Sequence, residues 1–177
     1  TQEHRTFSNI LNREFRWINP FCKLWTDISY LYYNSTKAYI SILKDMATWE
    51  IISHKLSSNL WLNFVLETIK DTDELNLRWS IIQSDQWFHY THPSYIELLR
   101  NYQIIQSMSR RWNCLDNAPT ESFFWHMKDE IDLSDIKSFK ELEKYIENYI
   151  FCYNNKRPQW ARKKMTPVQY RNHLLEN

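Results

Sequence analysis

The sequence predicts an α/β domain with a mixed five-stranded sheet flanked by helices. Three segments rich in β-branched and aromatic residues follow one another near the N-terminus, with only short polar breaks between them. Short apolar strands then alternate with helical patterns, an order that implies parallel pairing. The last part of the chain has helical spacing only. An antiparallel meander that continues into parallel units requires a mixed sheet.

Each element has its own local signal. The expected elements are strands over residues 24–33, 38–47 and 50–57, a helix over 61–70, a strand over 80–84, a helix beginning near Pro93, a strand over 103–108, and helices over 118–131 and 138–153. A last short helix opens with Thr166 as its N-cap and Pro167 in its first turn. Three strands, a helix, a strand, a helix, a strand and closing helices is the order of an RNase H-like domain.

Composition limits the class of protein. A chain of 177 residues with 43% hydrophobic content can form one domain with a substantial core, and a mean hydropathy of -0.64 without a long apolar run argues against a membrane span. Cys22, Cys114 and Cys152 are far apart, which favours neither zinc nor a disulfide framework and fits a reducing cytosol. The first residues lack the apolar core of a signal peptide. We expect the chain to be the C-terminal part of a longer protein.

Three acidic residues occupy chemically informative positions. Asp27 lies in the middle of the first strand, Asp85 ends the fourth, and Glu121 lies in the first turn of the helix after the fifth. With the first strand central and the fourth beside it, the two aspartates emerge side by side and the helix brings the glutamate above them. Such oxygen ligands suit Mg²⁺ or Mn²⁺, and a pair of these ions supports phosphodiester displacement. The alternatives are a chance spacing among 21 acidic residues and, for Glu121, a helix-capping role.

The basic residues are unevenly distributed, although the net charge is only +1. Residues 156–171 carry six basic groups and no acidic one, and Arg110 and Arg111 form a smaller pair. A basic tail suits contact with phosphate, and a solvated surface is the alternative interpretation.

Several longer motifs resemble one protein family. They are WTDISY, IIQSDQWFHYTHPSYIELL, IIQSMSRRWNCLDNAPTESFFWHMKDE and YIFCYNNKRPQWARKKMTPVQYR. Together they resemble the catalytic core of bacterial insertion-sequence transposases of the third insertion-sequence family, whose second reading frame carries a retroviral-integrase-like DDE core. The resemblance runs from about Asn12 to Leu174. The family's acids fall on Asp27, Asp85 and Glu121, and the 35 residues between the last two are the family's own spacing.

The resemblance implies a function. Such enzymes use divalent metal, here Mg²⁺ or Mn²⁺ and two ions, to cleave DNA at transposon ends and to join a 3′-hydroxyl to a target phosphate. It implies DNA as substrate, at least a dimer for synapsis of two ends, and a bacterial cytoplasmic location at the nucleoid. It also implies a linker over residues 1–20 from an N-terminal DNA-binding region, a catalytic core over 21–155 and a basic tail over 156–177. Two alternatives are an RNA-degrading nuclease of the same fold and an inactive DNA-binding remnant.

Further residues are carried over as expected DNA contacts. Lys128 lies on the helix of Glu121, seven residues beyond it, and by analogy contacts DNA near the site; a solvated lysine is the alternative. Asn117 holds the loop before this helix or caps the helix. Arg110 and Arg111 flank the loop and contact phosphate. The tail contributes Lys156, Arg157, Arg162, Lys163 and Lys164.

The chain has no glycine and nine tryptophans. At an average usage of about 7%, roughly 12 glycines are expected. By resemblance, glycine belongs at eight of the tryptophan positions, and an indole there costs about 1 to 3 kcal/mol through strain or overpacking. We hypothesise that codons read as glycine in the source cell, namely UGA, are translated here as tryptophan; a decayed element is the competing explanation. The positions are Trp17, Trp25, Trp49, Trp61, Trp79, Trp87, Trp112 and Trp125.

Overall fold

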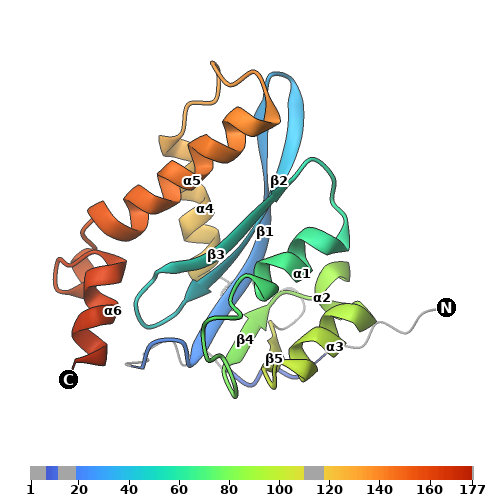
Figure 1. Ribbon diagram of the computed structural model, residues 1–177, viewed down its shortest axis with the longest axis vertical. Coiled ribbons are helices and arrows are strands. Elements are labelled where there is room, and N and C mark those ends of the chain that lie inside the picture. The colour runs from blue at the N-terminus through green and yellow to red at the C-terminus, as the bar shows by residue number, and fades with distance from the viewer. Residues whose placement is uncertain (1–6, 12–18, 110–117, 177) are drawn as a thin grey trace.

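The computed structural model describes residues 7–11, 19–109 and 118–176, with the backbone alone for residues 118–121. The strands are β1 (Lys23–Tyr33), β2 (Thr36–Asp45), β3 (Ile51–Ser57), β4 (Ile81–Ser84) and β5 (Ile105–Met108). The helices are α1 (Leu62–Lys70), α2 (Phe88–Thr91), α3 (Pro93–Asn101), α4 (Ala118–Glu130), α5 (Phe139–Lys156) and α6 (Pro167–Leu175), with a 3-10 turn, η2, over Trp160–Arg162. Figure 1 shows the sheet between the α1–α3 group and the pair α4 and α5.

The five strands form one mixed sheet in the order β3-β2-β1-β4-β5. β1 is antiparallel to β2 and parallel to β4, and β4 is parallel to β5. The hairpin between β1 and β2 turns at Asn34 and Ser35, whose φ angles of 42° and 57° give the left-handed turn that matches strand twist. The expected fold class is confirmed, with the first strand central and the fourth beside it.

Each face of the sheet has its own hydrophobic core. Leu24 and Ile28 of β1 belong to the core with α1 and α3, whereas Leu31 and Tyr33 belong to the core with α4 and α5. Because successive side chains of a strand point to opposite faces, Asp27 lies on the face that α4 covers. The alternation along β1 therefore decides which helix approaches the first candidate carboxylate.

Local capping signals explain where the last helices begin. Thr166 and Gln169 form a reciprocal capping box at the start of α6, with Pro167 in the first turn as expected. Ser138 caps α5 by accepting a hydrogen bond from Glu141 N at 3.3 Å. Two short elements were not expected: the loop after Asp85 includes α2, and the basic tail includes η2. Both are single turns, too short to show a helical period.

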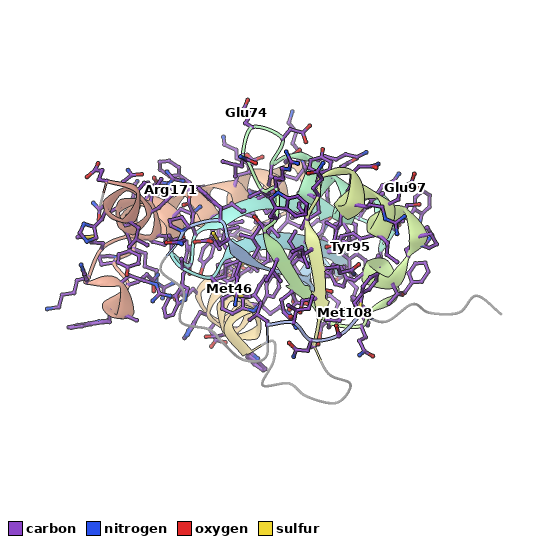
Figure 2. All side chains as sticks on the ribbon, turned by 90° about the horizontal axis from the view of Figure 1, so that it is seen from below. Met46, Glu74, Tyr95, Glu97, Met108 and Arg171 are labelled. Atoms are coloured by element: carbon purple, nitrogen blue, oxygen red, sulfur yellow. The ribbon has the colours of Figure 1, made fainter. Side chains whose placement is uncertain are left out.

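Long-range polar contacts fix the C-terminal elements on the sheet. The amide of Asn154 in α5 exchanges two hydrogen bonds with Ile51 of β3, at 3.0 and 2.9 Å. Arg171 of α6, labelled in Figure 2, forms an ion pair with Glu50 at 2.6 Å. Arg162 of η2 donates to the Met46 carbonyl at 3.1 Å. The C-terminal segment is therefore docked against the turn between β2 and β3.

Candidate active site

The register between β1 and β4 places the two candidate aspartates opposite each other. The pairs run from Lys23 with Ile81 to Trp25 with Gln83. Continued by two residues, this register sets Asp85 opposite Asp27. Neighbouring strands lie about 4.8 Å apart, and residues opposite each other point to the same face. The two carboxylates therefore leave adjacent strands on the side that α4 covers.

Both carboxylates are oriented by nearby backbone amides. Asp27 Oδ1 accepts a hydrogen bond from Ile28 N at 2.9 Å, and Asp85 Oδ1 accepts one from Trp87 N at 2.9 Å. Both side chains are partly exposed, so solvent and a ligand can reach their remaining lone pairs. This pair of carboxylates offers oxygen ligands alone.

Tyr90 of α2 lies near both aspartates, and no sequence pattern predicted a role for it beyond its place in an aromatic loop. Its side chain is buried, and its hydroxyl is 3.5 Å from Thr26 Oγ1. Burial, together with the negative charges of Asp27 and Asp85, raises the pKa of Tyr90 well above its usual value. Tyr90 therefore stays a neutral phenol in the core, next to Thr26.

Helix α4 carries the third candidate acid. Glu121 is in the first turn of this helix, as expected, and α4 contacts β1. The Glu121 side chain lies outside the described residues, so its distance to the aspartates is not defined. No group of three or more His, Cys, Asp or Glu side chains arranged for metal occurs among the side chains that are described. The triad stays a prediction, for which the aspartate register and the position of α4 are the structural support.

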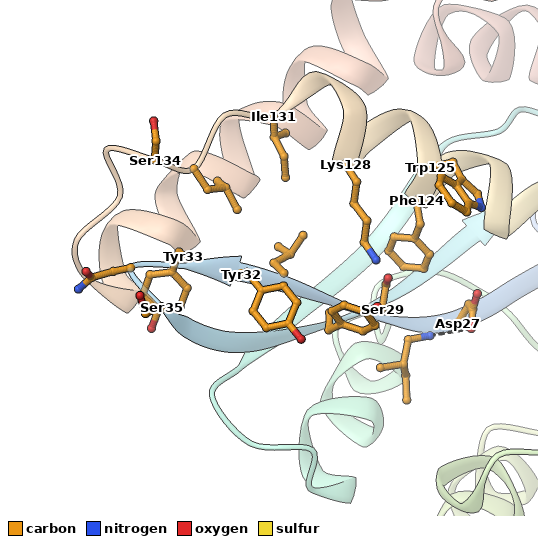
Figure 3. A pocket seen from close by; sticks show the side chains of 15 residues that line it. Asp27, Ser29, Tyr32, Tyr33, Ser35, Phe124, Trp125, Lys128, Ile131 and Ser134 are labelled. Atoms are coloured by element: carbon orange, nitrogen blue, oxygen red, sulfur yellow. Dashed lines mark hydrogen bonds between the residues drawn. The ribbon is translucent and has the colours of Figure 1, made fainter.

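Lys128 extends from α4 toward the same region (Figure 3). Its Nζ lies 4.2 Å from the centre of the Tyr30 ring. Partial burial lowers the pKa of Lys128, and the negative charge of Asp27 opposes this effect. The lysine lines a pocket of about 670 Å³. Asp27 and the following residues of β1, as far as Tyr33, line the same pocket. Lys128, one of the expected DNA contacts, thus lines the same pocket as a candidate catalytic carboxylate.

The other expected DNA contacts are distributed differently. Arg110, Arg111 and Asn117 lie outside the described residues. Arg157 is bound to Glu130 through two hydrogen bonds of 2.7 and 2.5 Å. The guanidinium of Arg162 stacks 4.3 Å from the centre of the Trp49 ring, in addition to its bond to the Met46 carbonyl. Both arginines thus hold the tail to the core, an intramolecular role that composition alone does not reveal.

The remaining tail lysines are exposed. Lys156 lies 5.6 Å from the Phe151 ring centre and Lys164 lies 4.6 Å from that of Trp160. Lys163 Nζ is 2.9 Å from His173 Nε2. These weak surface contacts leave all three ammonium groups accessible to a phosphate, and their DNA contact stays a prediction.

Two tryptophans have the backbone geometry that glycine prefers. Trp49 and Trp79 have φ angles of 68° and 69°, in the left-handed region. Trp61 and Trp87 have ordinary extended backbones, and these two indoles and that of Trp125 are exposed rather than overpacked. Trp25 is buried beside Met46. Trp17 and Trp112 lie outside the described residues. Among the six of these positions that the structure describes, backbone strain therefore concerns two, and the expected overpacking does not occur at the exposed ones.

No helix in the described part of the chain is both long and apolar enough to cross a membrane.

The fold resembles retroviral integrases. The catalytic core domain of HTLV-2 integrase in complex with magnesium (dimeric form) aligns with a TM-score of 0.67 at 14% identity, over 88% of this chain and 99% of that one. A chain of the simian T-cell lymphotropic virus intasome in complex with the PP2A regulatory subunit B56 gamma aligns with a TM-score of 0.73 at 12% identity, over 97% of this chain and 60% of that one. At these identities the likeness shows the fold, an RNase H-like domain.

Comparison of sequences shows the family. The model of the integrase core domain matches residues 121–175. The putative transposase InsK of insertion sequence element IS150 from Escherichia coli K12 is 35% identical over 171 residues, which cover 95% of this chain and 60% of InsK. An uncharacterized transposase-like protein of Haemophilus influenzae is 35% identical over 185 residues, which cover 99% of this chain and 86% of that protein. The chain thus spans about three fifths of InsK. It belongs to the bacterial insertion-sequence transposases with an integrase-type catalytic core.

Proposed function

We propose that this chain is the catalytic core that cleaves DNA at insertion-sequence ends and transfers the resulting strand to a target. The observation that carries the proposal is the parallel pairing of β1 with β4 as far as Trp25 and Gln83, because this register, continued by two residues, would bring Asp85 opposite Asp27 on the face covered by α4. The family relationship, a polynucleotidyl transferase of the DDE type, supports the same chemistry.

The two aspartates fit a divalent metal. Their carboxylates supply the hard oxygen atoms that Mg²⁺ and Mn²⁺ prefer, and their partial exposure leaves room for water and phosphate oxygens. The magnesium in the HTLV-2 integrase core supports this assignment by analogy. Asp27, Asp85 and Glu121 would hold the metal, with two ions in the full site. Bound there, the ions would activate the attacking hydroxyl and neutralise charge on the phosphate.

The protein's own groups prepare the site. The amides of Ile28 and Trp87 hold the carboxylates in place before metal arrives. The raised pKa keeps the Tyr90 hydroxyl neutral, so that it adds no negative charge near the pair. Lys128 supplies positive charge on the substrate side, where the DNA backbone would pass.

A metal-binding measurement combined with a cleavage assay tests the proposal. Titration of Mn²⁺ followed by electron paramagnetic resonance is expected to show binding to the unchanged chain and at least tenfold weaker binding to Asp85→Asn, because one charged ligand is lost. Cleavage of supercoiled DNA with terminal repeats is expected to disappear in Asp85→Asn and in Glu121→Gln. Asp135→Asn, an exposed carboxylate beyond α4, is the matched control and is expected to keep both activities.

Comparing substrates distinguishes the transposase from the two alternatives, the RNA-degrading nuclease and the inactive DNA-binding remnant. Stronger cleavage of an RNA–DNA hybrid than of DNA with terminal repeats would contradict the transposase proposal and favour the nuclease. DNA binding that persists in Asp85→Asn, with no cleavage by the unchanged chain in Mg²⁺ or Mn²⁺, would favour the inactive remnant. Equal metal binding by Asp85→Asn and the unchanged chain would refute the metal site itself.

The partners follow from the same proposal. Joining two transposon ends to one target requires at least two catalytic cores, so the working form is an oligomer on DNA. Its place would be the bacterial cytoplasm, at the nucleoid. The division into a linker over residues 1–20, a catalytic core over 21–155 and a basic tail over 156–177 stays a prediction.

A further inference from the structure

The strand that carries Asp27 has an open edge. β1 is paired with β2 from Leu24 with Asp45 as far as Tyr33 with Thr36. On its other side, the β4 pairs end at Trp25 with Gln83. Within the described ranges no strand accompanies β1 from Asp27 to Tyr33 on that side. The edge thus runs on directly from the candidate active site.

Two exposed tyrosines of β1 lie close to lysines of two other elements, Lys37 of β2 and Lys128 of α4. Tyr30 and Tyr32 are 46% and 61% exposed, and their rings meet edge to face with centroids 5.5 Å apart. Lys37 Nζ lies 4.7 Å from the Tyr30 ring centre and 5.5 Å from that of Tyr32. Lys128 approaches Tyr30 from α4. We call these four residues the tyrosine ledge.

The ledge and the candidate active site share one pocket. The pocket of about 670 Å³ is lined by Asp27, Tyr30 and Tyr32 on β1 and by Lys128 on α4 (Figure 3). At about 3.3 Å per residue along a strand, Tyr30 and Tyr32 lie about 10 and 17 Å beyond Asp27. A DNA strand whose phosphate reaches Asp27 would therefore pass the ledge within a few nucleotides.

We propose that the tyrosine ledge binds unpaired nucleotides of the DNA strand next to the reacting phosphate. This inference rests on the proposed function, because it places the reacting phosphate at Asp27. Bases stack on the exposed ring of Tyr32 and on Tyr30, and Lys37 and Lys128 contact the intervening phosphates. Exposed aromatic rings beside cations are the chemistry of single-strand recognition.

An open strand edge can also bind an extended peptide. The charge and the accessibility of the tyrosine ledge favour a nucleic acid instead. A peptide that adds a strand uses backbone hydrogen bonds and needs no cations. Here each exposed ring is accompanied by an ammonium group, and the pocket continues to the carboxylate pair proposed to bind metal. A frayed or unpaired DNA end supplies both the bases and the phosphates that this arrangement matches.

The test measures affinity for short DNA without catalysis. The protein is Asp85→Asn throughout, and the probes are a fluorescent thymidine decamer and a blunt duplex of equal length. The decamer is expected to bind more tightly than the duplex. Tyr32→Ala is expected to weaken decamer binding about tenfold, whereas Tyr32→Phe, which keeps the ring, retains it. Tyr145→Ala, an exposed tyrosine on α5, is the matched control and is expected to change nothing.

Salt dependence and photochemistry locate the contact. Lys37→Gln is expected to reduce the slope of log affinity against log salt by about 0.7, the value for one phosphate contact on a single strand, while Lys70→Gln on α1 leaves the slope unchanged. A decamer with 5-iodouracil is expected to cross-link to the peptide that contains Tyr30 and Tyr32. Cross-linking elsewhere, or equal affinity of Tyr32→Ala and Tyr32→Phe, would overturn the proposal.

The outcomes separate this inference from the proposed function. If Asp85→Asn abolishes cleavage but the Tyr32 variants bind the decamer equally, the catalytic proposal stands and the ledge is refuted. If the ledge variants behave as expected but Asp85→Asn still binds Mn²⁺ and cleaves normally, the ledge is a nucleic-acid site and the catalytic proposal fails. Circular dichroism of each variant confirms that the fold is retained.

Discussion

Replacing Trp79 is expected to stabilise the protein if glycine is chosen, and less so if alanine is chosen. Trp79 precedes β4 with φ at 69°, and its N–H donates to the Gln103 carbonyl at 2.8 Å. This bond ties the loop to the segment before β5, so the backbone cannot relax to a negative φ without losing it. The indole itself is 65% exposed, and both substitutions remove the same surface contact, that with the Arg78 guanidinium 5.4 Å from the ring centre.

The magnitude follows from comparing the two variants, since both remove the indole. A side chain with a Cβ in the left-handed region costs about 1 to 2 kcal/mol. Glycine costs about 0.4 to 1 kcal/mol more than alanine through the entropy of the unfolded chain. Trp79→Gly is therefore expected to be about 1 kcal/mol more stable than Trp79→Ala. For a domain of this size, that difference corresponds to about 2 to 4 °C in Tm.

The assay is urea denaturation of both variants, together with a matched pair at Trp160. Trp160 is 82% exposed and is not among the residues with positive φ. There the order should reverse, with Trp160→Gly less stable than Trp160→Ala by about 0.4 to 1 kcal/mol. If alanine equals or exceeds glycine at position 79, the left-handed backbone at this residue carries no cost and the strain reasoning is refuted.

Three further predictions concern other parts of the chain. Mass spectrometry of the protein from its source cell is expected to find glycine at positions 49 and 79, with UGA codons in the DNA; tryptophan encoded by UGG would instead indicate a decayed element. Asn154→Ala is expected to cost about 2 kcal/mol in urea denaturation, because both backbone groups of Ile51 lose their buried partner; an unchanged midpoint would contradict this. Burial, with the charge of Arg162, lowers the pKa of Lys44 from 10.5 to about 7, so the unfolded chain binds the extra proton between these pH values. The unfolding free energy should therefore rise with pH in this window by up to about 1.4 kcal/mol per pH unit, and Lys44→Met should lose that rise.

The sequence by itself determined the order of the elements and the residue types of the candidate site. Period-two and helical patterns are local, so the strand of Asp27, the strand end at Asp85 and the helix of Glu121 could be placed from residues nearby in the chain. The same locality explains the misses. α2 and η2 are single turns without a period, and the exposed indoles do not crowd their neighbours.

Only the tertiary structure decided which distant residues meet. The parallel register of β1 with β4, from which the position of Asp85 opposite Asp27 is inferred, depends on hydrogen bonds between strands that are far apart in the sequence. The docking of Arg162 on the turn after β2 assigns part of the basic tail to the core rather than to solvent. The packing of α4 against β1 brings Lys128 into the pocket that Asp27 and Tyr32 also line. Pairing and docking are chosen by the packing of the whole chain, and local residue patterns do not encode them.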